Sequence, residues 1–212
     1  MAGSAPLPIA ALDPAWTRVL RAHGDGVRAL QRLGLKYVDW TLTVAAGRWP
    51  AIDLAGHVLA TARSYHHLLD AALAGAPERG LPRGDDLADC GAARPATLGL
   101  SAGADRIVAF DAVATRYGER LHDLDPDLVL GEWDGVGVLT LRQHTMLAAG
   151  EWHLHAWDLA GALGWDYRPA DPEVLLEGRR LLPEPVPAGP AWTAVLAASG
   201  RQDPPGPRPL GP

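Results

Sequence analysis

Apolar residues along the chain repeat mainly at the three- and four-residue spacing of a helix face. Helix boundary signals accompany several of these stretches. Asp13 precedes Pro14 at the start of the first stretch, and Gly34 follows its last apolar residue. Thr140 and Gln143 have the spacing of a capping box at the start of another stretch. The pattern predicts long helices over residues 13–34, 53–74, 101–124 and 140–163, and short helices over residues 171–182 and 190–199.

The segments between these helices predict less regular structure. Residues 35–50 form a connection, and residues 76–100 are rich in Gly, Pro, Arg and Asp and predict a long loop. Residues 128–138 are apolar but interrupted by three glycines, which favours an extended segment. Ser101, directly after the long loop, is the expected N-cap of the third long helix. The sequence shows no alternating series of strands, so we expect an all-α fold, a four-helix bundle with short additional C-terminal helices.

Length and composition divide the chain into three parts. Its 212 residues are typical of one domain that buries its own core. Residues 202–212 contain five prolines and two glycines and are too poor in apolar groups to fold. We therefore expect an N-terminal extension at residues 1–12, one helical domain at residues 13–202, and a Pro/Gly-rich tail at residues 203–212.

Charge, cysteine content and missing motifs exclude several classes of protein. The net charge of −6 argues against a nucleic-acid partner, because such proteins usually carry a basic face. The chain has no apolar run of about 18 residues and no secretory signal pattern, so we expect no membrane partner. Cys90 is the only cysteine, which excludes an internal disulfide and favours a cytoplasmic location. The sequence also lacks the HExxH, Walker and GxSxG motifs of zinc proteases, P-loop NTPases and serine hydrolases.

A polar stripe on the fourth predicted long helix carries the most chemical information. Glu151 and His155 are four residues apart and project from one face, where both side chains can reach a single divalent ion. Asp158 and His144 lie seven residues to either side of Glu151, on the same stripe. Buried polar groups need partners or a metal. Asp158 is therefore a candidate carboxylate that orients a ligand, or simply an intrahelical partner, and His144 is a possible neighbour of the site.

A third ligand is expected from a facing helix, because two ligands are too few for tight metal binding. His57 is the leading candidate, since it lies near the start of the second long helix among apolar residues. His66 and His67 project elsewhere on that helix and are expected at the surface. A simpler alternative stays open, in which Glu151 and His155 form a hydrogen-bonded pair without a metal.

The other histidines and tryptophans carry no comparable pattern. His23 belongs to no motif, and His153 points away from the stripe. Trp49, Trp152 and Trp157 are expected in the core, because tryptophan brings a large apolar area.

Three blocks of the chain carry a resemblance to a known family. They are Arg48-Trp49-Pro50 with Leu54-Ala55-Gly56-His57, the stretch from Glu151 through His155-Ala156-Trp157-Asp158-Leu159-Ala160 to Gly164, and Ala191-Trp192 with Ser199-Gly200-Arg201. They resemble, in order, the Trp-containing entry into a ligand-bearing helix, the Glu-x-x-x-His-x-Trp-Asp-Leu-Ala block and the C-terminal Trp…Gly-Arg ending of one superfamily. It is the DinB-like, mycothiol-dependent maleylpyruvate isomerase metal-binding domain superfamily, and the resemblance spans residues 13–202.

This resemblance implies a DinB-like four-helix bundle that binds one divalent metal through His57, Glu151 and His155. The metal is usually zinc, with another divalent ion such as Ni²⁺ as the alternative. Members of the family use a low-molecular-weight thiol, mycothiol or bacillithiol, in isomerisation or thiol transfer. The chain has no room for the additional C-terminal domain of the isomerase itself, so the resemblance implies the wider chemistry rather than that one reaction.

We therefore expect a metal-dependent enzyme, a thiol-dependent transferase or isomerase. Its partners would be a small-molecule thiol such as mycothiol and a small electrophilic substrate, and the protein would be a monomer or a homodimer. Two rival functions use the same site. One is a metal-dependent hydrolase, in which a metal-bound hydroxide attacks the substrate. The other is a non-catalytic sensor or binding bundle for a small molecule.

Overall fold

The computed structural model of the chain describes residues 13–36, 39–44, 49–81, 100 and 102–201. The predicted N-terminal extension, the predicted tail and most of the predicted long loop, with Cys90, lie outside the described residues.

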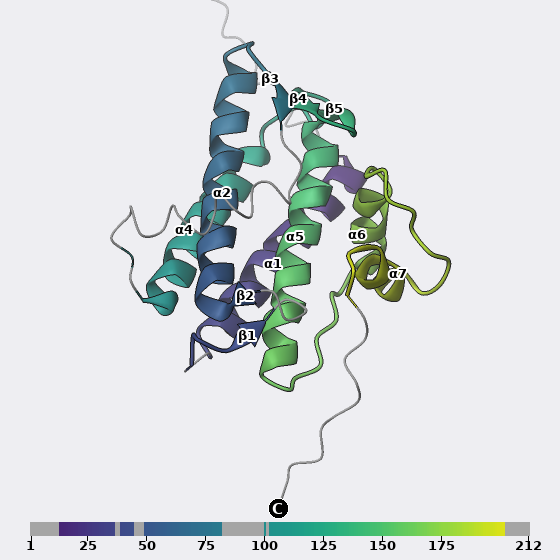
Figure 1. The fold of residues 1–212 in the computed structure, drawn as a ribbon. Coiled ribbons are helices and arrows are strands. Elements are labelled where there is room, and N and C mark those ends of the chain that lie inside the picture. Colours follow the sequence, from purple (N-terminus) through teal and green to yellow (C-terminus); the bar gives the residue numbers. More distant parts are fainter. Residues whose placement is uncertain (1–12, 37–38, 45–48, 82–99, 101, 202–212) are drawn as a thin grey trace, which may run out of the picture.

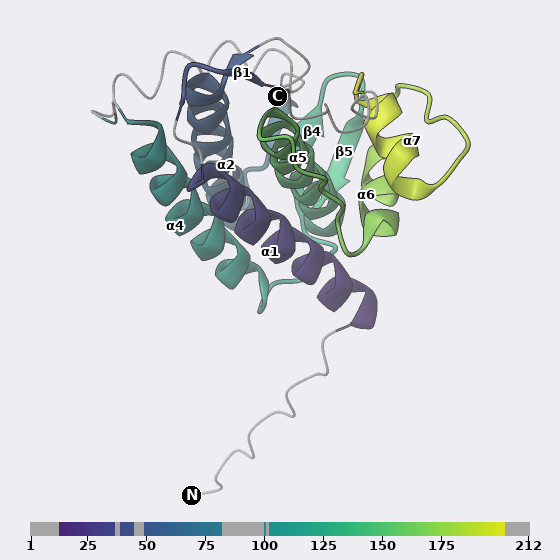
Figure 2. The same ribbon diagram turned by 90° about the horizontal axis from the view of Figure 1, so that it is seen from below.

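Four long helices pack side by side around a shared apolar core (Figures 1 and 2). They are α1 (Pro14–Gly34), α2 (Ala51–Leu73), α4 (Gly103–Leu121) and α5 (Leu141–Ala162). Two short helices, α6 (Pro172–Arg179) and α7 (Ala191–Ala198), pack against each other, and α6 contacts α5. The described residues therefore contain all six predicted helices, with boundaries that differ by a few residues.

The cap signals explain where two of the long helices begin. The Asp13 carboxylate accepts a hydrogen bond from the Ala15 backbone N–H at 2.9 Å, and Thr140 and Gln143 form the predicted capping box. The predicted cap residue Ser101 lies outside the described residues, and α4 begins at Gly103 after Ala102, which has no side-chain acceptor. Local cap chemistry thus places the start of α5, the helix that carries the polar stripe.

The prediction of a purely all-α fold is wrong, because the described residues include five short strands. β1 (Thr43–Val44) pairs antiparallel with β2 (Trp49–Pro50), directly before α2. A three-stranded sheet has the order β3-β4-β5, and it consists of β3 (Glu78–Leu81), β4 (Val129–Trp133) and β5 (Gly137–Thr140). β4 and β5 confirm the extended conformation predicted for residues 128–138. The left-handed backbone of Gly135 and Gly137, with φ of 70° and 99°, turns the chain between them.

α5 lies at the centre of the fold, between α1, α2 and α6 in Figure 1. Its contact with α1 is close at Gly26, where an added Cβ would lie 2.9 Å from the Cβ of Trp152. Trp152 itself is fully buried, as predicted. Among the described residues, no helix combines the length and the apolar composition that a membrane crossing requires. The fold thus holds α5 firmly against α1 and leaves another of its faces directed toward α2.

Candidate metal centre

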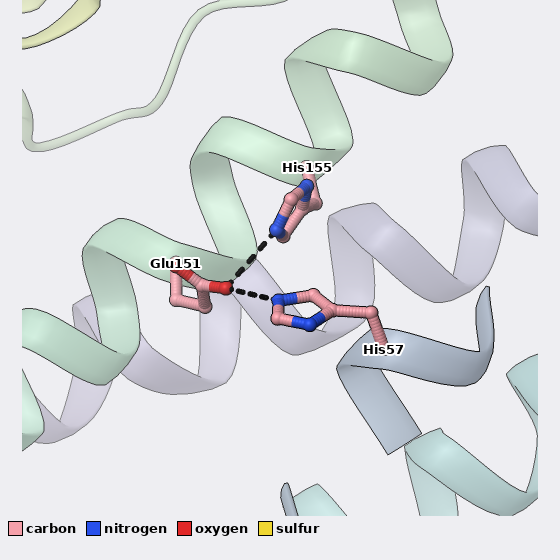
Figure 3. A group of neighbouring side chains, drawn as sticks. All are labelled: His57, Glu151 and His155. Atoms are coloured by element: carbon pink, nitrogen blue, oxygen red, sulfur yellow. Dashed lines mark hydrogen bonds and ion pairs between the residues drawn. The ribbon is translucent and has the colours of Figure 1, made fainter. Parts of the chain in front are cut away.

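Three side chains from two helices meet at the interface of α2 and α5 (Figure 3). The Nε2 atom of His57 lies 2.7 Å from Oε1 of Glu151, and the Nε2 atom of His155 lies 3.0 Å from the same oxygen. One potential ligand atom from each residue lies within 4.8 Å of the other two. This group can hold a metal ion, and it consists of the three residues that the sequence singled out.

Local structure explains why these side chains converge. Glu151 and His155 are four residues apart on α5 and therefore point in one direction. His57 lies in the second turn of α2, and the beginning of α2 lies beside the last turns of α5 (Figure 1). The side chains of both histidines are only 6% exposed, whereas that of Glu151 is 30% exposed. Among the described residues, the carboxylate is therefore the most exposed of the three side chains.

The electrostatics of the group depend on short contacts between opposite charges. Burial by itself would raise the pKa of Glu151, but the two imidazoles beside it outweigh burial and lower that pKa well below its ordinary value. Burial would lower the pKa of His155, but the carboxylates of Glu151 and Asp158 raise it to about 9. A proton on Nε2 and a metal ion use the same lone pair of His155, so the two compete for this atom.

Asp158 lies on the far side of His155 from Glu151. Its Oδ2 atom is 3.0 Å from Nδ1 of His155, and its side chain is completely buried. The guanidinium of Arg201 donates to both carboxylate oxygens, from Nε to Oδ1 at 2.9 Å and from Nη2 to Oδ2 at 2.6 Å. The desolvation of Asp158 is outweighed by its hydrogen bonds to His155 and Arg201, so its pKa lies below the ordinary value. Sequence reasoning proposed Asp158 as an orienting carboxylate but assigned no role to Arg201.

His144, the other possible neighbour, lies apart from the metal group. Its contacts are with Tyr117, whose hydroxyl is 3.5 Å from Nδ1, and with the rings of Tyr65 and Trp133. His144 shares a face of α5 with Glu151 but lies seven residues away, which is about 10 Å along a helix. It therefore packs with aromatic side chains in the core.

Trp49 forms one wall of the group. Its ring centroid lies 5.0 Å from that of His57 and 6.1 Å from that of His155, with an interplanar angle of 26° to the latter. The prediction of Trp49 as a core residue is confirmed in part, because its half-buried side chain packs against the core, but the ring also faces the metal group. Its position directly before the helix that carries His57 was the signal that could have placed it here.

The two histidines of the group differ in how their other ring nitrogen is held. Nδ1 of His155 has a carboxylate partner, but Nδ1 of His57 is buried and has no hydrogen-bond partner within the described residues. The orientation of His57 therefore depends on packing against Trp49 and on its contact with Glu151.

Comparison with known proteins adds no assignment to this geometry. No family model, no curated protein sequence and no solved structure matches the chain. The three side chains themselves are therefore the evidence for function.

Proposed function

We propose that the protein is a DinB-like, divalent-metal-dependent enzyme that uses a low-molecular-weight thiol such as mycothiol to transfer sulfur to, or to isomerise, a small electrophilic substrate. The observation that carries this proposal is the convergence of His57, Glu151 and His155 on one point between α2 and α5. The resemblance of the sequence blocks around these residues supplies the thiol chemistry.

The donor set fits zinc. Two imidazole nitrogens and one carboxylate oxygen are the ligand types of catalytic zinc sites, which keep a coordination position open for a small molecule. A divalent ion held by these residues would stabilise the deprotonated form of a coordinated thiol. Within the described residues, the protein contributes a partly exposed carboxylate at Glu151 and the flat ring of Trp49 beside both imidazoles.

The same geometry speaks against the hydrolase alternative. A hydrolase at this site needs a carboxylate that is free to take a proton from water. Glu151 contacts both imidazoles, and Asp158 is held by His155 and Arg201. Within the described part of the chain, both carboxylates beside the imidazoles are therefore committed to other partners, which favours a small-molecule nucleophile that brings its own sulfur.

Metal content is the first test of this proposal. We expect about one equivalent of zinc in the purified wild-type protein and almost none in Glu151→Ala, because two imidazoles alone hold the ion weakly. His67→Ala is the matched control, since His67 lies on α2 with an imidazole that is 75% exposed. It should keep the wild-type metal content, and equal metal in wild type and Glu151→Ala would contradict the site.

Thiol binding is the second test. Titration of mycothiol into the cobalt-substituted protein should produce a sulfur-to-cobalt absorption band, and S-methyl mycothiol, which has no free thiol, should not. Absence of the band with mycothiol and bacillithiol would overturn thiol chemistry. Thiol binding without turnover of any member of an electrophile panel would overturn the enzyme proposal in favour of a sensor.

A further inference from the structure

The residues beyond the metal group form a continuous chain of charged contacts from α5 to the end of α7. Arg201 contacts Asp158, Asp158 contacts His155, and His155 contacts Glu151, all at 3.0 Å or less. Asp158 is completely buried and the side chain of Arg201 is 15% exposed, so water screens this pair weakly. The contacts therefore join the C-terminal segment to one of the metal ligands.

The direction of the hydrogen bonds in this series of contacts follows from which atoms can carry a proton. The Asp158 carboxylate is ionised beside Arg201, and an ionised carboxylate can only accept hydrogen bonds. Nδ1 of His155 must therefore be the donor in its contact with Asp158. A neutral imidazole that carries its proton on Nδ1 has its lone pair on Nε2, the atom that faces Glu151.

The backbone at the end of α7 places the Arg201 side chain. The Arg201 N–H donates to the Leu196 carbonyl at 2.9 Å and the Gly200 N–H donates to the Ala197 carbonyl at 3.1 Å, which together form a Schellman motif. Gly200 has a φ of 69°, in the left-handed region that favours glycine. The guanidinium also donates from Nη1 to the Ser199 carbonyl at 3.3 Å. The position of the arginine is thus tied to the docking of α7.

We propose that Arg201 is a positioning residue for the metal centre, and that it couples docking of the C-terminal segment, residues 172–201, to metal binding. Arg201 holds the Asp158 carboxylate in place by two hydrogen bonds, and Asp158 keeps His155 in the tautomer and orientation that present Nε2 to the ion. This inference rests on the metal site of the proposed function. Within the described residues, Nδ1 of His57 has no hydrogen-bond partner, whereas Nδ1 of His155 has Asp158. Arg201 therefore acts on the metal centre through His155.

Coupling of this kind is reciprocal. If a docked C-terminal segment strengthens metal binding, metal binding strengthens docking of the segment by the same factor. Removal of partners that orient a ligand typically weakens metal binding by about 10- to 100-fold. The effect is therefore large enough to measure both as a change in zinc affinity and as a change in the docking of the C-terminal segment.

The test compares zinc affinity, by competition with a chromophoric chelator, in wild type, Asp158→Asn, Arg201→Gln and Arg201→Lys. We expect Asp158→Asn to bind zinc about 10- to 100-fold more weakly and Arg201→Gln about tenfold more weakly. Arg201→Lys should lie between Arg201→Gln and wild type, because lysine keeps the charge but not the two parallel hydrogen bonds. The matched control is Arg142→Gln, which removes a 2.6 Å ion pair to Asp13 at the other end of α5 and should leave zinc affinity unchanged.

Two further measurements separate positioning from general stability. In wild type, zinc should slow amide hydrogen exchange in α7, and in Arg201→Gln this protection should be lost. The absorption spectrum of bound cobalt should change in Arg201→Gln and stay unchanged in Arg142→Gln, because only the former alters the geometry of His155. If Arg201→Gln does not fold, Asp158→Asn, which preserves the shape of the side chain, carries the test.

The outcomes distinguish the two proposals. Wild type that binds zinc, together with Arg201→Gln and Asp158→Asn of unchanged affinity, overturns the coupling and leaves the proposed function standing. Wild type that binds no zinc overturns the proposed function, and the coupling falls with it.

Discussion

Two groups of buried histidines lie in the same helical core and differ in what faces them. The first is the pair at the metal centre, where the carboxylates of Glu151 and Asp158 raise the pKa of His155 to about 9 against the effect of burial. The second group, the core histidines, consists of His23, His144 and His153. Burial lowers the pKa values of these three to about 4, about 3 and about 4, respectively.

The partners of the core histidines are neutral. Nε2 of His153 donates to the Ala22 carbonyl at 3.1 Å, and its Nδ1 accepts from the Tyr167 hydroxyl. His23 lies against the rings of Tyr117 and Trp152. A neutral imidazole suits such surroundings, whereas a buried cation needs an opposite charge. Burial alone therefore does not distinguish a candidate ligand histidine from a core histidine. The charge of the group that faces the imidazole does distinguish them.

The largest predicted effect is acid destabilisation through the core histidines. Because their folded pKa values lie below the 6.5 of a free imidazole, the unfolded chain binds more protons than the folded chain from pH 6.5 down to about 4 for His23 and His153 and about 3 for His144. Their contribution to the free energy of unfolding is full above pH 6.5 and is lost as the pH falls through this range. Each contributes on the order of 3 kcal/mol.

Urea unfolding between pH 7 and pH 4 measures this loss. In His23→Leu the loss should be smaller than in wild type by the share of one histidine, because the substituted side chain takes up no proton. His67→Leu is the control, since its imidazole is exposed, and it should lose as much stability as wild type. An equal loss in wild type and His23→Leu would show that the core histidines do not control acid stability.

The second prediction concerns the negative charge of Glu151, which distinguishes the surroundings of the metal-centre histidines from those of the core histidines. In metal-free Glu151→Gln, the pKa of His155 should fall from about 9 toward that of a free imidazole, because its largest source of stabilisation is gone. NMR titration of the imidazole ring proton in the presence of a chelator measures this change. Glu132→Gln, on the exposed part of β4, should leave the pKa near 9. A pKa that also stays near 9 in Glu151→Gln would contradict the contrast drawn between the two groups.

The smallest predicted effect concerns a neutral partner. Tyr167→Phe removes the hydroxyl that donates to Nδ1 of His153 and should lower the free energy of unfolding by about 1 kcal/mol. Thermal unfolding measures the loss, and zinc affinity should stay at the wild-type value because His153 projects away from the metal group. A change in zinc affinity would mean that the two histidine groups are linked.

Sequence reasoning worked well where the signal was local. The four-residue spacing of Glu151 and His155 predicted a shared direction, and the cap residues Asp13 and Thr140 predicted where two of the long helices begin. His144 was overestimated as a neighbour of the site, because two residues on one helix face that are seven positions apart are still about 10 Å apart along the axis. The position of His144 among aromatic rings depends on which helices surround α5.

Local sequence patterns did not predict the contacts between residues that are far apart along the chain. Arg201 and Asp158 are 43 residues apart, and nothing in the intervening segment predicts that the end of α7 folds back onto α5. The pairing of the short strands was equally unpredictable, because β3 pairs in parallel with β4, which lies far away in the sequence. Such pairs become visible only when the tertiary structure brings them together.

The ion pair between Arg201 and Asp158 also has a consequence for the order of events during synthesis. The ribosome makes His57, Glu151 and His155 well before Arg201, and folding begins with the parts that emerge first. If Arg201 positions His155, the nascent chain carries all three ligands before it carries the residue that holds one of them in place. Loading of the metal at full affinity then has to wait until Arg201 has been synthesised and has reached Asp158.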